Sequence, residues 1–267
     1  MLVTGFPAGS FAANCYVVAP AAGEECVIID PGQDAQPGID EILARYRLKP
    51  IAVLLTHGHI DHVWSVAPVC GARGIPAYIH PDDRELLSDP AKGLSLGATQ
   101  RLFGGLTFSE PDDVLELADD MTITLAGVDF TVAHMPGHTA GSVTFGTTAA
   151  DGGPGTGAMP ARGDDPFGVD PQRFPGGHPR TPEPPRGDNG SPEETILFSG
   201  DLLFAGSIGR TDLPGGDHQE ILRSLERTLT LPDETIVLPG HGPQTTIGAE
   251  RAHNPFLTGL RPAQKGM

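Results

Sequence analysis

The chain has 267 residues, with 17 Lys and Arg against 34 Asp and Glu, and therefore carries a net charge of −17. This acid excess argues against a protein that binds the phosphate backbone of nucleic acid, because such a protein needs a basic face. No apolar run reaches the length of a membrane span, and the first residues lack the basic and apolar segments of a signal peptide. We therefore expect a soluble, cytoplasmic protein that binds neither nucleic acid nor membranes.

The composition permits a sizeable core, since hydrophobic residues make up 38% of the chain. Its three cysteines, Cys15, Cys26 and Cys70, are odd in number and form no Cys-x-x-Cys pair. This argues against a disulfide framework and against a zinc knuckle. We expect the cysteines to be small buried apolar residues.

The first 149 residues alternate short β-branched runs with helical patterns. Cys15–Ala19 and Glu25–Asp30 are separated by a turn segment and predict a β-hairpin, Ile39–Tyr46 has helical spacing, and Ile51–Leu55 predicts a buried strand. The elements expected next are helices at His62–Gly71 and Asp82–Ser88, and strands at Ala77–Ile79, Val114–Leu117, Thr122–Leu125, Asp129–Ala133 and Ser142–Gly146. The mixture predicts an α/β protein with many strands.

Residues 150–194 differ in character from the rest of the chain. They contain ten glycines and ten prolines and show neither the period of a strand nor that of a helix. Such a segment cannot bury enough apolar surface to offset its chain entropy. We predict a disordered insertion from Ala150 to Glu194 within a single domain that spans residues 1–267. After it we expect strands at Thr195–Ser199 and Thr235–Leu238, and helices at Gln219–Leu229 and Ala249–His253.

The segment from Thr56 to His62 reads Thr-His-Gly-His-Ile-Asp-His and directly follows the strand Ile51–Leu55. His57 and His59 lie two residues apart, so in an extended segment both imidazoles can reach one ion. The chain then turns and projects Asp61 and His62 elsewhere. Imidazole and carboxylate ligands suit zinc, iron or manganese. Because four ligands would leave no open position on one catalytic ion, the segment predicts two adjacent metal sites.

Three further polar residues each follow a predicted strand. His138 follows Asp129–Ala133, Asp201 follows Thr195–Ser199, and His241 follows Thr235–Leu238. In layered α/β folds, the loops at strand ends build the functional site. Each residue alone is typical of a turn or a helix cap, but together with the first cluster they indicate one metal centre.

These motifs resemble those of the metallo-β-lactamase-fold hydrolases, and most closely those of the glyoxalase II-like branch, the hydroxyacylglutathione hydrolase-type proteins. The His-x-His-x-Asp-His cluster and the later His, Asp and His carry the superfamily resemblance. Further matching segments are Asn14-Cys15-Tyr16, Asp30-Pro31-Gly32, Gly206 to Asp212, and Glu250 to Phe256. The resemblance therefore covers nearly the whole chain outside the insertion.

The resemblance implies the four-layer αββα sandwich of the metallo-β-lactamase fold, in which two mixed sheets pack face to face with helices outside. It also implies a cofactor of two divalent metal ions, zinc first and iron or manganese as alternatives. One ion would be held by His57, His59 and His138, the other by Asp61, His62 and His241, with Asp201 bridging the two.

The activity that the resemblance implies is hydrolysis of a small-molecule thioester such as S-lactoylglutathione. Two close ions lower the pKa of a bound water, and the resulting hydroxide attacks a carbonyl group. Asp61 would be the catalytic carboxylate that orients this hydroxide. Asp30 resembles the family's buried aspartate behind the metal ligands, although an ordinary turn aspartate fits equally well. Arg210 suits a substrate carboxylate or, alternatively, an ion pair with Asp212 or Asp217.

Other activities share these metal ligands. A persulfide dioxygenase-like enzyme would hold one iron with His57, His138 and Asp201. A lactonase or a ribonuclease Z-like enzyme fits the cluster but finds no support in the charge. Class B β-lactamases usually carry Cys in place of Asp201 and are exported, which argues against that activity. Glyoxalase II proper has a C-terminal domain that holds glutathione; the few residues after His241 lack those contacts and leave the thiol carrier open.

Overall fold

The computed structural model describes residues 1–95, 107–149 and 194–260. Residues 150–193 of the predicted insertion therefore lie outside the described residues. Glu194 does not: it is the first residue of strand β10 (Glu194–Gly200) and pairs with Ala149, the last residue of β9 (Val143–Ala149). The predicted insertion was thus one residue too long, because strand pairing begins at Glu194.

Six strands form the first sheet, in the order β1-β2-β3-β4-β5-β6. They are β1 (Leu2–Ala8), β2 (Ala13–Ala19), β3 (Glu25–Ile29), β4 (Lys49–Leu54), β5 (Ala77–Ile79) and β6 (Val114–Glu116). The predicted hairpin is confirmed, because β2 and β3 pair antiparallel, and β3 to β6 run parallel. β1 was not predicted: Gly5 and Pro7 interrupt its apolar pattern, and pairing with β2 along its whole length holds it extended.

The second sheet also has six strands, in the order β14-β13-β10-β9-β8-β7. Besides β9 and β10 it contains β7 (Thr122–Leu125), β8 (Val128–His134), β13 (Ile236–Pro239) and β14 (Thr245–Thr246). β8 and β9 pair antiparallel, as do β9 and β10, whereas β10 and β13 run parallel. Strands β8, β10 and β13 therefore point in one direction and end at the same edge of the sheet.

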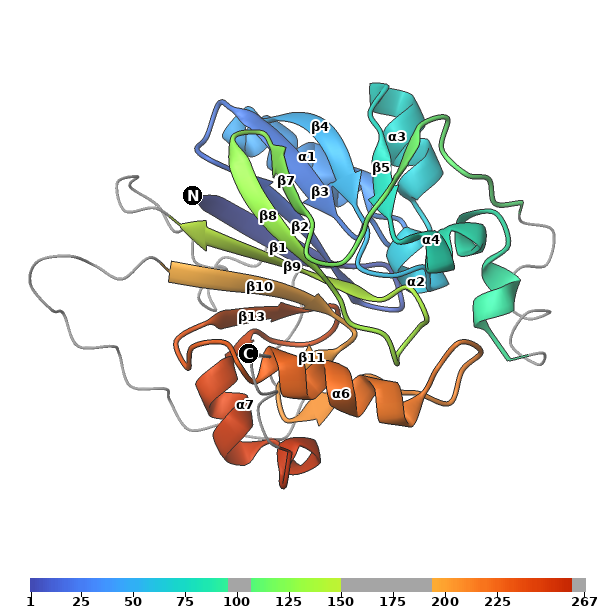
Figure 1. Cartoon of the computed structure of the whole chain (residues 1–267). Coiled ribbons are helices and arrows are strands. Elements are labelled where there is room, and N and C mark those ends of the chain that lie inside the picture. The colour runs from blue at the N-terminus through green and yellow to red at the C-terminus, as the bar shows by residue number, and fades with distance from the viewer. Residues whose placement is uncertain (96–106, 150–193, 261–267) are drawn as a thin grey trace, which may run out of the picture.

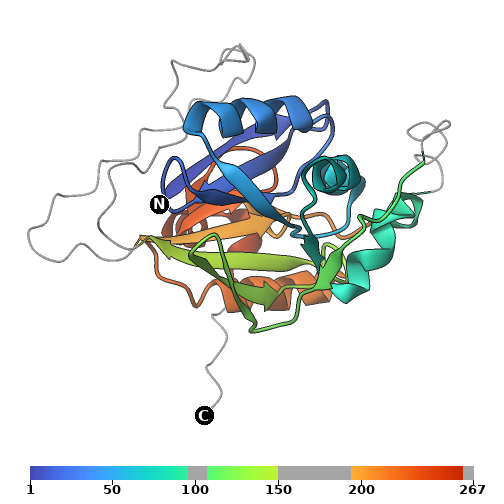
Figure 2. The same cartoon turned by 90° about the horizontal axis from the view of Figure 1, so that it is seen from above.

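Helices cover the outer faces of the two sheets, as Figures 1 and 2 show. They are α1 (Gln36–Tyr46), α2 (Ile60–Val63), α3 (Val66–Arg73) and α4 (Pro81–Arg84) on the side of the first sheet, and α6 (His218–Thr228) and α7 (Ile247–His253) on the side of the second. Short elements complete the order: 3-10 turns η1 (Glu85–Leu87), η2 (Pro90–Gly93) and η4 (Pro255–Leu257), and the hairpin β11 (Leu203–Phe204) and β12 (Ser207–Ile208).

The helix predicted over His62–Gly71 is two helices, α2 and α3, separated by Trp64 and Ser65. The break has a tertiary cause. The Ser65 N–H donates to the Pro31 carbonyl oxygen at 3.0 Å, and the Ser65 hydroxyl accepts from Ala35 N–H at 3.3 Å. These contacts fasten the end of α2 to the loop after β3.

Alternation along the central strands divides the apolar side chains among three layers of core. In β3, Cys26 and Ile28 face the helices α1 and α3, while Val27 and Ile29 face the second sheet. In β10, Ile196 and Phe198 face the first sheet, while Leu197 packs with α6 and α7. Strands buried on both faces read as continuous apolar runs, which explains the pattern seen in the sequence. The αββα sandwich expected from the resemblance is confirmed.

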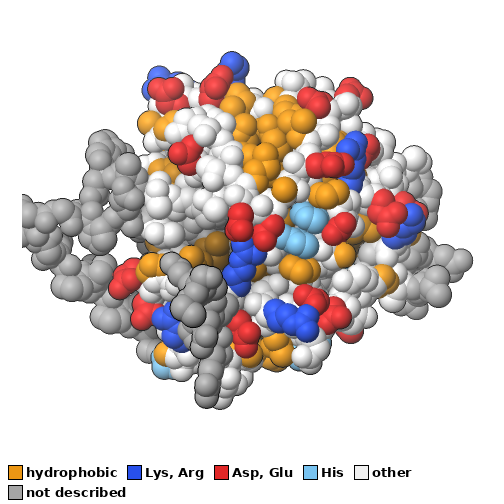
Figure 3. All heavy atoms as spheres, viewed as in Figure 1, with side chains coloured by type: hydrophobic (Ala, Val, Ile, Leu, Met, Phe, Trp, Pro, Cys, Tyr) orange, Lys and Arg blue, Asp and Glu red, His pale blue; other side chains and the backbone are white. Residues whose placement is uncertain are grey.

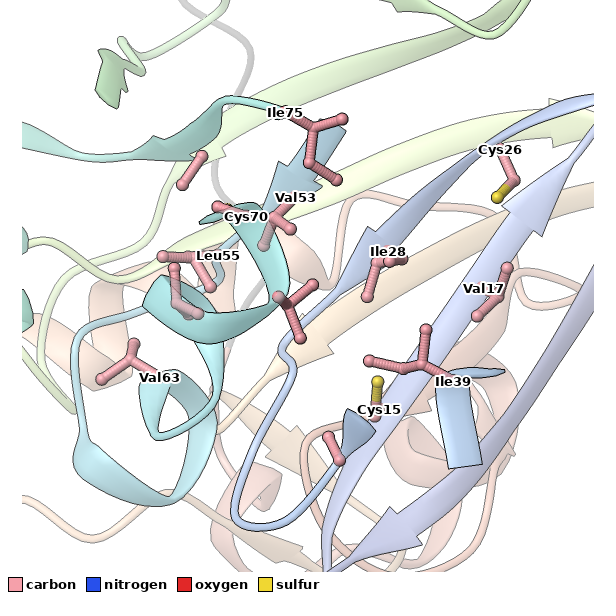
Figure 4. Packing of buried hydrophobic residues seen from close by; sticks show 14 of the residues in the cluster. Cys15, Val17, Cys26, Ile28, Ile39, Val53, Leu55, Val63, Cys70 and Ile75 are labelled. Atoms are coloured by element: carbon pink, nitrogen blue, oxygen red, sulfur yellow. The ribbon is translucent and has the colours of Figure 1, made fainter. Parts of the chain in front are cut away.

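The three cysteines are unpaired and buried, as expected. Cys15 and Cys26 lie on strands beneath α1 and α3, and Cys70 lies on α3 itself. All three belong to the outer core that Figure 4 shows, together with Val17, Ile28 and Ile39. Burial raises the pKa of the Cys26 and Cys70 thiols to about 12. In the described part of the chain, no helix is both long enough and apolar enough to span a membrane.

The inter-sheet core generates a stability prediction. Phe145 of β9 is fully buried between the sheets, so Phe145→Ala should lower the free energy of unfolding by about 3–5 kcal/mol through lost contacts and a cavity. Leu115→Ala is the control, because Leu115 is 41% exposed and its loss should change stability by less than about 0.5 kcal/mol. Urea unfolding measures both; equal effects would contradict the core described here.

Candidate metal centre

Loops at the ends of four strands bring the predicted ligands together. The segment from Thr56 to His62 follows β4, and the loops after β8, β10 and β13 supply His138, Asp201 and His241. The two sheets are linked at this edge, because Asn14 N–H of β2 donates to the Gly240 carbonyl oxygen at 2.7 Å. Residues up to 184 positions apart in sequence, from His57 to His241, thus converge on one place.

The first group comprises His57, His59 and His138, and all three are buried. Their ligand atoms lie within 4.8 Å of one another, which is close enough for one ion. His59 Nδ1 and His138 Nε2 are only 2.8 Å apart. The opposite nitrogen of His138, Nδ1, donates to the Arg210 carbonyl oxygen at 2.7 Å, which directs Nε2 into the cluster.

The second group comprises Asp61, His62 and His241, again within 4.8 Å of one another. His241 Nε2 lies 3.1 Å from Asp61 Oδ2 and 3.3 Å from His62 Nε2. Asp201 stands between the two groups: its Oδ1 is 3.4 Å from His62 Nε2, and its Oδ2 is 3.6 Å from His138 Nε2 and 3.7 Å from His241 Nε2. This arrangement of seven side chains is consistent with a dinuclear metal centre.

The electrostatics of the centre keep two imidazoles neutral, the form in which histidine binds metals. Burial and the neighbouring histidines lower the pKa of His57, and burial together with His138 lowers the pKa of His59 to about 3. Burial opposes ionisation of Asp61 and Asp201, but the neighbouring histidines, His62 foremost, together outweigh it and lower the pKa of both carboxyls. The centre therefore combines imidazoles, two of them held neutral, with carboxylates, the donor set of zinc, iron or manganese.

Buried polar atoms without partners provide a test of whether a metal fits. His57 Nε2, His59 Nε2 and Asp201 Oδ1 are buried and accept or donate no hydrogen bond. An unpaired buried polar atom costs free energy, and native proteins rarely leave one unmatched. His57 and Asp201 both belong to a group of possible ligands, with His62, whose ligand atoms lie within 4.8 Å of one another. Metal ions at the centre would supply the missing partners of His57 Nε2 and Asp201 Oδ1, whereas His59 already faces His138 with its other nitrogen, Nδ1.

Asp30 lies behind the centre, at the end of β3. Its Oδ1 accepts from Thr56 N–H at 2.8 Å, and its Oδ2 accepts from the Thr56 hydroxyl at 2.6 Å and from His62 Nδ1 at 3.0 Å. Its backbone has φ of +50°, a left-handed conformation in which non-glycine residues are uncommon. Asp30 thus fixes the orientation of His62 directly, and that of His57 through the Thr56 hydroxyl, which lies 3.0 Å from His57 Nδ1.

Asp83 is a polar residue of the site region that the sequence analysis missed. It is buried, and its carboxylate accepts from Gly58 N–H, Gly141 N–H and the Thr139 hydroxyl. Asp83 lies within a predicted helix next to Asp82, and nothing in the local pattern separates the buried aspartate from the exposed one. No sequence signal identified it, because its partners come from two distant loops.

Arg210 takes the second of its two predicted arrangements. Its Nε and Nη2 donate to the two carboxylate oxygens of Asp212, both at 2.7 Å, and the pair is exposed. Its backbone carbonyl oxygen, rather than its guanidinium, contacts the centre through His138. The segment is anchored to the C-terminal elements, because Glu250 accepts from Gly206 N–H at 2.8 Å and Asn254 donates to the Ser207 carbonyl oxygen at 3.0 Å.

With this geometry, comparison with known proteins identifies the class. The family model described as "Metallo-beta-lactamase superfamily" matches residues 8–151 and 160–241. The chain belongs to this superfamily of metallo-hydrolases, as the resemblance implied.

Among curated relatives, an uncharacterised protein of Mycobacterium tuberculosis strain H37Rv is 44% identical over 97% of this chain and 99% of that protein. "Probable metallo-hydrolase YqgX" of Bacillus subtilis is 31% identical over 95% of this chain and 96% of its own. "Hydroxyacylglutathione hydrolase GloC" of Haemophilus influenzae is 28% identical over 94% and 95%.

Two solved structures agree with the fold over nearly the whole chain. The crystal structure of BLEG-1 B3 metallo-β-lactamase has a TM-score of 0.70 and 37% identity, covering 96% of this chain and 100% of that one. The crystal structure of TTHA1623 in a di-iron-bound form has a TM-score of 0.63 and 36% identity, covering 93% and 97%.

Close packing at Gly240 generates a prediction about metal content. A Cβ there would lie 2.2 Å from Asp201 Oδ1 and 2.7 Å from His62 Cε1, so Gly240→Ala should displace both side chains and reduce the metal ions bound per chain. Gly71→Ala is the matched control, because nothing lies within 4 Å of a Cβ at that position. Elemental analysis after dialysis measures both variants, and a full metal complement in Gly240→Ala would contradict the geometry.

Proposed function

We propose that this protein is a dinuclear metal-dependent thioester hydrolase of the glyoxalase II-like branch. The observation that carries the proposal is the division of seven side chains into two three-residue groups, with Asp201 between them. A mononuclear enzyme needs only one such group. The similarity to GloC over nearly the whole chain supports the choice of branch.

In this proposal each ion has its own set of ligands. His57, His59 and His138 would hold the first, Asp61, His62 and His241 would hold the second, and Asp201 would contact both. When bound, two such ions make water acidic enough to act as a nucleophile at neutral pH and polarise the carbonyl group of the substrate. Zinc fits this donor set, and the di-iron form of TTHA1623 makes iron the alternative that elemental analysis must distinguish.

Asp61 is suited to orient the attacking water. Its side chain is 23% exposed and that of His241 is 29% exposed, whereas His62 is fully buried. Water and substrate therefore reach the centre past Asp61 and His241. A carboxylate there accepts a hydrogen bond from the water and aligns its lone pair with the carbonyl carbon, and hydrolysis of the thioester then gives a carboxylic acid and a thiol.

The same experiments distinguish thioester hydrolysis from two other activities. The similarity to BLEG-1 makes cleavage of a β-lactam amide the second candidate. A one-iron persulfide dioxygenase-like activity would use His57, His138 and Asp201, and the metal count and oxygen uptake separate it from the proposal. Figure 3 shows basic side chains lying among acidic ones on the face it presents, which supports a small-molecule substrate rather than nucleic acid.

His59→Ala tests the proposal directly. Removing one ligand of the first ion should abolish turnover of S-lactoylglutathione and lower the metal content together, because both depend on the same imidazole. His253→Ala is the control, since His253 is exposed at the end of α7. Hydrolysis is followed by thiol release, and metal by elemental analysis.

The outcomes distinguish the candidates. About two ions per wild-type chain, with thioester cleavage, support the proposal. A single iron with oxygen uptake on glutathione persulfide, or turnover of a chromogenic β-lactam without thioester cleavage, would replace it. A His59→Ala variant that keeps both metal and activity would refute the assignment of the centre.

Arg210 supplies a second prediction, about substrate binding. Because an exposed ion pair is weak, a substrate carboxylate can displace Asp212 and accept both N–H groups of Arg210. Arg210→Ala should then raise KM for a carboxylate-bearing thioester about tenfold and leave kcat nearly unchanged. Arg223→Ala, which removes an exposed guanidinium paired with Glu220 on α6, should change neither constant. An unchanged KM in Arg210→Ala would show that Arg210 pairs with Asp212 and does not bind the substrate.

A further inference from the structure

Asp83 joins the two loops that carry all three ligands of the first ion. Gly58, whose N–H donates to Asp83 Oδ2 at 2.8 Å, stands between His57 and His59. Thr139, whose hydroxyl donates to the same oxygen at 2.7 Å, directly follows His138. Gly141 N–H donates to Oδ1 at 2.7 Å, so all three bonds reach these two loops.

The packing around Asp83 is equally close. A Cβ on Gly141 would lie 2.7 Å from Asp83 Cγ, and a Cβ on Gly58 would lie 2.9 Å from the Asp83 carbonyl oxygen. Both loops therefore have glycine where they approach Asp83. The side chain is 1% exposed, and a buried carboxylate that lost its donors would be strongly destabilised.

A second contact fastens α4, the helix that carries Asp83, to the loop of His138. His80, which precedes α4, stacks on His134 at the end of β8, with ring centroids 4.0 Å apart and planes inclined by 7°. His134 Nε2 in turn donates to the Ala140 carbonyl oxygen at 2.8 Å. Parallel rings do not aim their nitrogen lone pairs at one point, so this pair acts by stacking and not as a further metal site.

We infer that Asp83 is a positioning residue that holds the site of the first ion, His57, His59 and His138, in its binding geometry. The inference rests on the proposed dinuclear function. The hydrogen bonds of the Asp83 carboxylate go to Gly58, Thr139 and Gly141, next to ligands of the first ion, and none goes to Asp61, His62 or His241. His62 is held by Asp30 instead. Removal of the Asp83 carboxylate should therefore weaken the binding of the two ions unequally. Partners behind metal ligands typically change metal affinity about 10–100-fold.

The experiment is a stepwise zinc titration of the metal-free full chain against a chromogenic chelator, which gives a dissociation constant for each ion. Asp83→Asn keeps the size of the side chain but places an amide NH₂ where an oxygen accepts, so one dissociation constant should rise at least about tenfold. The other should stay within about threefold of the wild-type value. Asp82→Asn, on the same helix and 57% exposed at its side chain, should change neither constant.

Thr139 provides variants that keep the inference testable if Asp83→Asn does not fold. Thr139→Val removes one of the three donors at almost constant volume. It should raise the same dissociation constant as Asp83→Asn, but by a smaller factor. Thr139→Ser restores the hydroxyl and should restore the wild-type constant. A merely structural role would not distinguish the valine from the serine variant by metal affinity.

Phe130→Leu controls for general destabilisation. Phe130 lies in the core between the sheets, so this substitution should lower Tm without changing either dissociation constant. If Asp83→Asn raises both dissociation constants equally, or raises neither, the inference is overturned. The proposed function would still stand in that case, provided that the wild-type chain binds two ions. Failure of the wild-type chain to bind two ions overturns the proposed function itself.

Discussion

Seven imidazole and carboxylate side chains face one another at one edge of the sandwich, and the burial of four of them, His57, His59, His62 and His138, is the constraint on which the surrounding structure depends. Polar groups that are buried away from water need hydrogen-bond partners, and here residues outside the cluster provide them. Thr56, Asp30 and the Arg210 carbonyl oxygen each engage Nδ1 of one histidine. These three contacts turn the Nε2 atoms of His57, His62 and His138 inward. The outer hydrogen bonds therefore determine what the inner atoms can bind.

Strand direction explains how distant residues meet at that edge. β8, β10 and β13 run the same way in the second sheet, so the residues after their last positions emerge side by side. In the first sheet, β3 and β4 run parallel and deliver Asp30 and His57 to adjoining positions. Sheet pairing thus supplies coarse placement. Fine placement comes from loop contacts and from glycines, such as Gly240, that let backbone approach side chains closely.

The local part of this design could be predicted from sequence, and the non-local part could not. The spacing of His57, His59, Asp61 and His62 indicated two sites, and most strands were recognised from their apolar runs. The split between α2 and α3 depends on a bond from Ser65 to Pro31, and β1 is held by its partner strand in spite of Gly5 and Pro7. Asp83 is the clearest case. Its sequence neighbourhood is that of an ordinary helix start, and its importance arises from donors 25 and 58 residues away.

The pairing of Ala149 with Glu194 brings together the two residues that flank residues 150–193. β10 is seven residues long, so its first residue lies about 20 Å from the end that leads to Asp201. The described chain leaves the sheet at Ala149 and returns to it at Glu194, at the end of β10 far from Asp201, and residues 150–193 connect these two points in sequence. Their number and composition can change without altering the spacing of any ligand, because the antiparallel ladder between β9 and β10 closes the connection first. A longer or shorter connection at this junction should therefore leave the edge that carries the ligands unchanged.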